Sequence, residues 1–274
     1  MRIQKALLVF RKDWREVSRN WEVILPIVIL PLMFSVLLPL VIGLIPSLAS
    51  TPGSSSSGFE AIKKNLPIPV QDELAGMTDQ QVMFYIMSLY FFAPFFLIIP
   101  LMASSVIASD SFAGEKERRT IEALLATPIS DSELFLGKTL VSFIPSMIVT
   151  LISFLAYSTT VNLSSFMILN GRLLLPNAVW IMLIFGLAPT VALASIGLTV
   201  MISAKVKGFR EAQQISSLLL VPILLLVFGQ ISGVILVGPT LIGWFMGIFV
   251  IIDLIVFHFG IRMFGREEIL SKLA

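Results

Sequence analysis

The Gly-Lys-Thr triplet at 137–139 is the first candidate for chemistry in this chain, because these residues end a phosphate-binding loop. Such a loop also needs a glycine five positions before the glycine of the triplet, where the backbone curls its amide groups around the phosphates. That position is Ser132 here. Ser130 and Glu133 instead have the spacing of a capping box, which begins a helix. The sequence therefore predicts a helix start rather than a nucleotide site, with Lys138 extending to the edge of an apolar region.

Asp253 is the second candidate, because it interrupts a long apolar stretch. An ionisable side chain at membrane depth is costly unless it is paired or hydrated, so Asp253 could bind a cation or line a transport pathway. The alternative is a protonated or hydrogen-bonded carboxyl that only packs helices. His258 follows five residues later, but catalysis would need a nucleophile with a base, or a metal constellation. The chain has no cysteine, which excludes disulfides and thiolate ligands, and we predict no catalytic residue and no metal site.

The segment 114–139 carries nine charged residues, and its first part has the pattern of a short amphipathic helix over about 115–126. Glu115 and Glu117 fall in the first turn, where negative charge suits the helix dipole. Other residues are spaced for i,i+4 ion pairs or an apolar face: Glu115 with Arg119, Arg118 with Glu122, and Ile121, Leu124 and Leu125 together. Thr127-Pro128 ends the helix. This helix could transmit force from a partner protein or rest on the membrane surface, and the residues alone leave both hypotheses open.

The composition of the chain indicates the class of protein in which these residues lie. Hydrophobic residues make up 57% of 274 positions, charged residues make up 13%, and the mean hydropathy is +0.96. A soluble domain has roughly 45–50% apolar and about 25% charged residues. The chain is therefore predicted to be an all-α integral membrane protein.

The charge-free runs give the number of spans. They are 23–59, 80–109, 139–171, 173–204 and 212–252. A crossing helix needs about 20 apolar residues. The last run is too long for one crossing and contains Gly238-Pro239, so it is predicted to hold two helices. The six predicted spans are about 23–46, 82–107, 140–162, 177–203, 214–236 and 241–263.

The distribution of basic residues orients these spans. Of 19 Lys and Arg residues, only Lys63, Lys64 and Arg172 fall in the connections on one side. The other 16 lie in the N-terminal segment, in the second-to-third and fourth-to-fifth connections, and at the C-terminal end. Because cytoplasmic loops carry the excess of basic residues, both termini are predicted to be cytoplasmic. The predicted organisation is a cytoplasmic segment 1–22, a membrane domain 23–264 with an external loop 47–81 and a cytoplasmic loop 108–138, and a cytoplasmic tail 265–274.

The first 21 residues have the pattern of an amphipathic helix. One apolar stripe alternates steps of four and three along Ile3, Leu7, Phe10, Trp14, Val17 and Trp21, and the other faces are basic. A basic helix with Trp on its apolar side is expected to lie in the membrane interface. The alternative is a helix that packs on a soluble partner.

Residues 114–130 read GEKERRTIEALLATPIS. This segment resembles the one that follows the second span in ABC transporter permeases of the ABC-2 type, which have a Glu-x-Glu-Arg-x-Thr-hydrophobic-Glu core followed by Leu-Leu and Thr-Pro. The matching positions are Glu115, Glu117, Arg118, Thr120, Glu122, Leu124, Leu125, Thr127 and Pro128. Arg119 departs from the glycine that family members often have before the threonine.

Two further segments resemble the NatB-like, sodium-exporter branch of that family. KGFREAQQIS at 207–216 is similar to the connection before the fifth span, with Arg210, Glu211 and Gln213 in it. MFGREEIL at 263–270 is similar to the ending after the last span.

The resemblance implies a permease subunit of an exporter in a prokaryotic-type plasma membrane, not an enzyme. It would form a homodimer or heterodimer and work with two separate ABC ATPase subunits, which would bind ATP and Mg²⁺, so no cofactor is expected in this chain. Residues 115–128 would be the coupling element seated on the ATPase, and 207–213 the second contact. Asp253 is the candidate pathway residue, and no nucleic acid is expected as a partner. The alternatives are an ion-coupled carrier or channel, or an intramembrane enzyme that uses Asp253 and His258.

Overall fold

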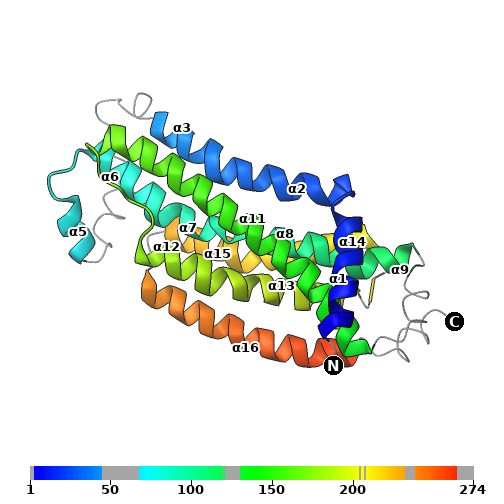
Figure 1. Cartoon of the computed structure of the whole chain (residues 1–274). Helices are drawn as coiled ribbons and strands as arrows, with labels where there is room; N and C mark the ends of the chain where they lie inside the picture. The colour runs from blue at the N-terminus through cyan, green and yellow to red at the C-terminus, as the bar shows by residue number, and fades with distance from the viewer. Residues whose placement is uncertain are drawn as a thin grey trace.

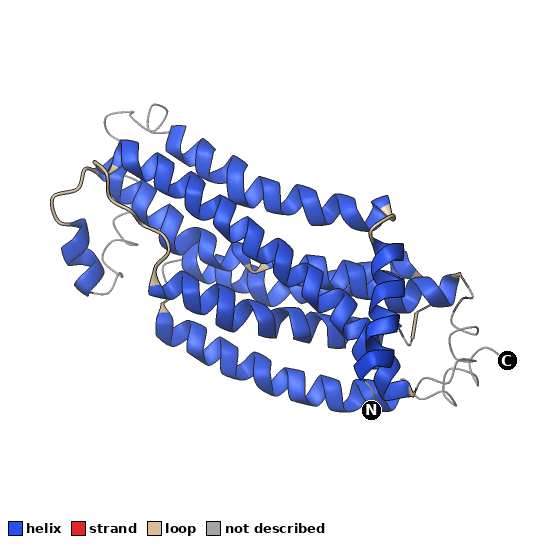
Figure 2. Cartoon of the chain, in the orientation of Figure 1, coloured by secondary structure: helices blue, strands red, loops and turns tan. Residues whose placement is uncertain are grey.

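Six long apolar helical segments run side by side in the structure, which is a computed structural model (Figure 1). It describes residues 3–44, 68–118, 120, 130–203, 205–206, 208–231 and 238–263. These residues form helices, turns and loops, with no strand among them (Figure 2). The predicted fold class, all-α with six candidate membrane-spanning helices, is confirmed.

Each span is either one helix or several short helices joined end to end through π-helical or 3-10 turns. The first consists of α2 (Trp21–Leu32), η1 (Met33–Leu37) and α3 (Leu38–Leu44), and the second of α6 (Asp79–Ile86), η3 (Met87–Phe91), α7 (Phe92–Phe96), α8 (Ile98–Ser109), η4 (Asp110–Gly114) and α9 (Glu115–Glu117). The third is α11 (Asp131–Ile168), the fourth is α12 (Ala178–Met182), η5 (Leu183–Leu187) and α13 (Ala188–Ser203), the fifth is α14 (Phe209–Ser216), η6 (Ser217–Leu219) and α15 (Leu220–Ile231), and the sixth is α16 (Pro239–Met263). Among the described residues, two helices lie outside the spans, α1 (Ile3–Val17) and α5 (Ile68–Leu74).

The second span is the centre of the bundle. Of the residues in its most apolar window, 72% are buried, against 17% in the first and sixth spans. The outer faces of the first, fifth and sixth spans expose large apolar side chains, among them Leu32, Leu225 and Trp244. An apolar outer surface around a buried central helix is what a lipid environment requires, since lipid tails cover apolar groups without cost.

An aromatic cluster holds the second, third and fourth spans together. The rings of Tyr157 and Trp180 stack with their centroids 4.7 Å apart. The hydroxyl of Tyr157 donates to the carbonyl of Ser88 at 2.7 Å, and Nε1 of Trp180 donates to the carbonyl of Leu89 at 3.0 Å. Both acceptors lie in the π-helical turn η3, so buried side chains of two other spans fix this irregular turn of the central span.

Two spans are longer than the sequence predicted. The second continues to Glu117 rather than ending near 107, and the third begins at Asp131 rather than near 140. The helix start itself was predicted, since the Ser130–Glu133 capping box is present at the N-terminus of α11. The single helix α11 has 38 residues, which is about 57 Å at 1.5 Å per residue. Both helices run through charged residues without a break, because those charges are paired inside the protein.

Helix α1 lies across one end of the bundle, crosswise to the spans (Figure 1). Its buried face consists of Ala6, Val9, Asp13 and Val17, and this face packs against α11. The predicted apolar stripe is therefore divided: Val17 is buried, whereas Leu7 and Trp14 are exposed. The exposed part keeps the apolar character that an interfacial helix needs, and its position in a membrane interface stays a prediction.

Candidate functional site

The residues predicted to start a separate helix instead end the second span. Glu115–Glu117 forms its last turn, and Arg118 lies in the turn that follows. The N–H of Thr120 donates to the carbonyl of Glu115 at 3.0 Å, which closes this end. The prediction that Glu115 lies in the first turn of a new helix is wrong, because paired charges let the spanning helix continue through this position. The other predicted residues of this segment, Arg119, Ile121, Glu122, Leu124, Leu125, Thr127 and Pro128, lie outside the described residues.

Glu115 is buried and takes part in an ion pair with Lys138. Only 1% of the Glu115 side chain and none of the Lys138 side chain is exposed, and Lys138 Nζ lies 2.6 Å from Glu115 Oε2. The same ammonium lies 3.3 Å from Asp13 Oδ2 and also donates to the carbonyl of Ser111. Lys138 therefore does not extend to the membrane surface as predicted, because its charge has partners in the interior.

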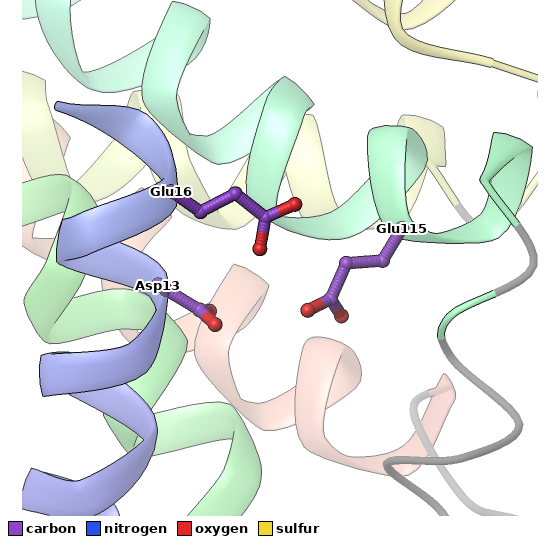
Figure 3. Close-up of side chains that lie close together, drawn as sticks. All are labelled: Asp13, Glu16 and Glu115. Carbon is purple, nitrogen blue, oxygen red and sulfur yellow. The ribbon is translucent and has the colours of Figure 1, made fainter. Parts of the chain in front are cut away.

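Three carboxylates of this region turn toward one another, Asp13 and Glu16 from α1 and Glu115 from the end of the second span (Figure 3). One oxygen of each lies within 4.8 Å of the others, a spacing that a metal ion could use. Two ammonium groups already lie among them, however, since Lys12 contacts all three carboxylates and Lys138 contacts two of them. The lysines compensate the negative charge, so this group is an ion-pair cluster.

The charge of Lys12 is stabilised by this cluster. Burial alone would lower the pKa of Lys12, but the hydrogen bond to Glu115 and the negative charges of Asp13 and Glu115 outweigh it and raise the pKa above its ordinary value. Lys12 therefore remains protonated at neutral pH.

Arg118 makes a second link between the same elements. Its guanidinium lies 3.0 Å from Asp110 Oδ1, in η4, and 2.8 Å from Glu16 Oε1, on α1. Asp110 is buried, and Nδ2 of Asn20, which caps α2, donates to the same oxygen at 3.3 Å. Arg118 thus contacts α1 and the second span, and Glu122, its predicted i,i+4 partner, lies outside the described residues.

Lys116 and Glu117 connect this region to the fourth-to-fifth connection. Nζ of Lys116 donates to the carbonyl of Val206 at 3.0 Å, and Oε2 of Glu117 accepts from the N–H of Phe209 at 2.9 Å. Phe209 is the first residue of α14, so the carboxylate stabilises a helix N-terminus. A Cβ at Gly208 would lie 2.6 Å from Glu117 Oε2, which explains why this position has no side chain.

The four consecutive residues Glu115–Arg118 thus reach α11, α1, the connection at Val206 and the start of α14. We call these residues and their contacts the junction, and the end of the bundle that holds them the junction end. The segment after the second span and the segment before the fifth, which were predicted as two separate contacts with a partner, therefore meet in the structure.

Helix α1 crosses α11 at Gly137. A Cβ on Gly137 would lie 2.7 Å from the carbonyl oxygen of Ala6 and 2.8 Å from Cβ of Val9. The glycine of the Gly-Lys-Thr triplet therefore permits a close helix crossing. The lysine of the same triplet is the positive charge that is buried at this crossing.

The residues predicted on the second contact segment differ in exposure. The Arg210 side chain is 83% exposed and lies 3.3 Å from Glu22 Oε1. Glu211 is also exposed, and Gln213 is half-buried. The first turn of α14 therefore presents charged side chains to the outside, next to the junction.

Asp253 lies on α16, apart from the segments that form the junction. The side chain is 9% exposed, and within the described part of the chain its buried Oδ1 atom has no hydrogen-bond partner. An unpartnered carboxylate oxygen at this depth is unusual, which keeps Asp253 a candidate for a role beyond packing.

The profile of the ABC-2 family transporter protein matches residues 7–243, which is most of the chain. The chain belongs to the ABC-2 transporter family. It is therefore a multi-pass membrane protein, and members of this family are non-catalytic membrane subunits, which argues against the intramembrane enzyme. ABC-2 permeases generally pair with ATPase subunits. No curated protein matches the chain.

Sequence reasoning missed Asp13, Glu16, Asp110 and the role of Lys138. One signal was available: Asp13 and Glu16 are acidic residues on an otherwise basic helix, and Lys138 follows a capping box inside a predicted helix. These positions lie up to 125 residues apart, and no local pattern pairs them.

Proposed function

We propose that this chain is the permease subunit of an ATP-driven exporter, that it forms a dimer, and that it works with a separate ATPase subunit. The proposal places the junction end in the cytoplasm of a prokaryotic-type cell, because 16 of 19 basic residues are assigned to that side. Export, and kinship with the NatB-like branch, rest on the resemblance of 207–216 and 263–270.

The observation that carries this proposal is the meeting of two loop segments at one end of the bundle. Glu117 and Phe209 are hydrogen-bonded although 92 residues separate them. An ATPase that contacted either segment would move both, because they are tied together. A single rigid docking site is what force transfer from an ATPase requires.

The proposal divides the predicted contact residues into three groups. Glu115, Glu117, Arg118 and Thr120 hold the base of the coupling element, because each is bonded to another residue at this end of the bundle. Glu122, Leu124, Leu125, Thr127 and Pro128 would then supply the surface seated on the ATPase. Arg210, Glu211 and Gln213 would border that surface.

Asp253 is proposed to line the transport pathway. Its buried oxygen, which has no hydrogen-bond partner among the described residues, would accept a proton or coordinate a cation that passes between the spans. A channel or ion-coupled carrier would use the same residue, but the family pairs its permeases with ATPases, and this favours the ATP-driven mechanism.

The test is co-expression of the chain with the neighbouring reading frames, among which the proposal expects one that encodes an ABC ATPase. We expect the chain and this ATPase to co-purify in detergent and ATP hydrolysis to depend on the permease. A permease that purifies alone, with hydrolysis unaffected by its presence, would contradict the proposal.

The docking surface is tested by Leu124→Arg, with Leu173→Arg as the matched control. Leu173 is an exposed leucine in the connection at the other end of the bundle. We expect Leu124→Arg to abolish co-purification and Leu173→Arg to preserve it. Charge reversal at Glu115 would be a poor test of docking, because a reversed charge in the buried cluster would disturb folding first.

A further inference from the structure

Lys138 is an unusual residue for a membrane span, because its whole side chain is buried. Its ammonium contacts three elements at once: α1 through Asp13, η4 through Ser111, and α9 through Glu115. The hydroxyl of Ser111 also donates to Asp13 Oδ2 at 3.0 Å, which closes the cluster. One side chain of the third span thus joins the N-terminal helix to the end of the second span.

Stability alone is a poor explanation for this arrangement. Burying an ion pair costs desolvation that its mutual attraction often only offsets, and a well-packed apolar pair is frequently as stable. What a buried, hydrogen-bonded charge does supply is one defined arrangement, because any displacement of its partners leaves a charge uncompensated. The cluster is therefore suited to holding three elements in a fixed relation.

We propose that Lys138 is a positioning residue that makes α1, the end of the second span and the start of the third span move as one unit. This inference rests on the proposed function, since the movement would come from an ATPase acting on the segment that begins at Glu115. Lys138 is not part of the docking surface. It determines which helices move when the ATPase acts on that segment.

The geometry on both sides of Lys138 supports this role. Helix α11 is a single helix from the cluster to the far end of the bundle, with Pro145 within it, so a displacement at Lys138 would be passed along the third span. Helix α1 leads through the turn at Ser18 and Asn20 directly into the first span. The backbone contact at Gly137 and the ion pair of Arg118 with Glu16 hold the same elements next to Lys138.

The experiment separates positioning from stability with two variants. Lys138→Met leaves Asp13 and Glu115 buried with Lys12 as their only lysine partner, and we expect its Tm to fall by about 5–10 °C. Lys138→Met/Glu115→Gln removes one charge of each sign, so we expect its Tm to return close to that of the unaltered protein. If that variant does not recover, Lys138→Met/Asp13→Asn, which neutralises the other carboxylate, takes its place. Arg15→Met, which removes an exposed charge from α1, is the matched control.

The readout is movement of the third span in the permease–ATPase complex. Because the chain has no cysteine, spin labels can be placed at Leu163→Cys, at the far end of α11, and at Phe185→Cys in the fourth span, both exposed. We expect ATP with vanadate to change the distance between these labels in the unaltered background and in Arg15→Met. In the charge-balanced double variant the change should be lost, although the complex is as stable and still binds nucleotide.

A double variant that keeps the full distance change overturns the inference, because the movement of the third span would then be independent of Lys138. A role in stability alone predicts this same result, since Tm and movement would recover together. If no ATPase binds the unaltered permease, the proposed function fails instead, and the inference fails with it.

Discussion

The backbone N–H of Phe209 donates a hydrogen bond of 2.9 Å to Oε2 of Glu117. One partner ends the second span and the other begins the fifth, so this bond ties two of the six spans together where both leave the bundle. A carboxylate at a helix N-terminus satisfies a free N–H and meets the positive end of the helix dipole. The connection after the second span and the connection before the fifth are therefore stabilised by the same hydrogen bond.

The Glu117–Phe209 contact predicts the effect of two substitutions. Glu117→Ala removes the cap of α14 and should lower the free energy of unfolding by about 1 kcal/mol. Gly208→Ala places a methyl group where the carboxylate lies and should cost a similar amount. Because both break the same bond, their effects in the double variant should not add.

These effects can be measured as unfolding of the purified protein in mixed micelles. Gly243→Ala is the matched glycine control, because no atom lies within 4 Å of the Cβ it would add. Fully additive losses would show that Glu117 and Gly208 act separately, and would contradict a shared contact as the cause of both losses.

The crossing of α1 over α11 predicts that Gly137 tolerates no side chain. A methyl group there would overlap the carbonyl oxygen of Ala6, which is backbone and cannot rotate away. Gly137→Ala should therefore displace α1 and lower the unfolding free energy by about 1–3 kcal/mol. Gly247→Ala, with open space around its Cβ, is the control, and equal stability of the two variants would contradict the close crossing.

Arg210 predicts a separation between stability and docking. Its ion pair with Glu22 is exposed on both sides, and such pairs contribute about 0–1 kcal/mol. Arg210→Ala should therefore leave the Tm nearly unchanged and weaken ATPase binding, measured by titration of the ATPase against hydrolysis rate. Arg172→Ala, at the other end of the bundle, should change neither quantity; an unchanged titration for Arg210→Ala would remove this residue from the docking surface.

The fold could be predicted from the sequence, because each helix that crosses the membrane needs about 20 apolar residues and therefore appears as a charge-free run. The ends of the spans could not be predicted in this way. Asp110, Glu115 and Lys138 were taken to lie outside the spans because they are charged, whereas in the structure they are paired inside continuous helices. The start of α11 follows a local signal, the Ser130–Glu133 capping box, whereas the end of the second span depends on ionic partners distant in sequence, about which a periodicity argument contains no information.

The packed face of α1 shows the same limit. Its strongest apolar stripe includes Leu7 and Trp14, yet the face that packs on α11 contains Ala6 and Asp13. The choice depends on the surface opposite, where Gly137 admits a small residue and Lys138 requires an acid. For this reason the candidate site was only partly predictable. Glu115, Glu117 and Arg118 were identified as important, but their bonding partners are residues that no local sequence pattern connects to them.

The ion cluster also predicts a pH response. The pKa of Lys12 is raised, so its contribution to stability is fully present below the unfolded value of about 10.4 and is lost only as the pH rises through the folded value. The difference in Tm between the unaltered protein and Lys12→Met should then stay constant from about pH 6 to about pH 9. A difference that shrinks within this range would show that Lys12 is not held in its charged form.

Asp253 gives the prediction that bears on transport. Asparagine has nearly the same shape and carries no charge, so Asp253→Asn should fold with equal or greater stability, because the buried carboxylate oxygen has no donor among the described residues. If Asp253 binds a proton or a cation on the pathway, the same change should abolish the dependence of ATP hydrolysis on cation concentration in vesicles that contain permease and ATPase. Asp72→Asn, on the exposed face of α5, is the matched control and should keep that dependence. If Asp253→Asn is fully active and still cation-dependent, Asp253 has only a packing role, because transport would then not need its carboxylate.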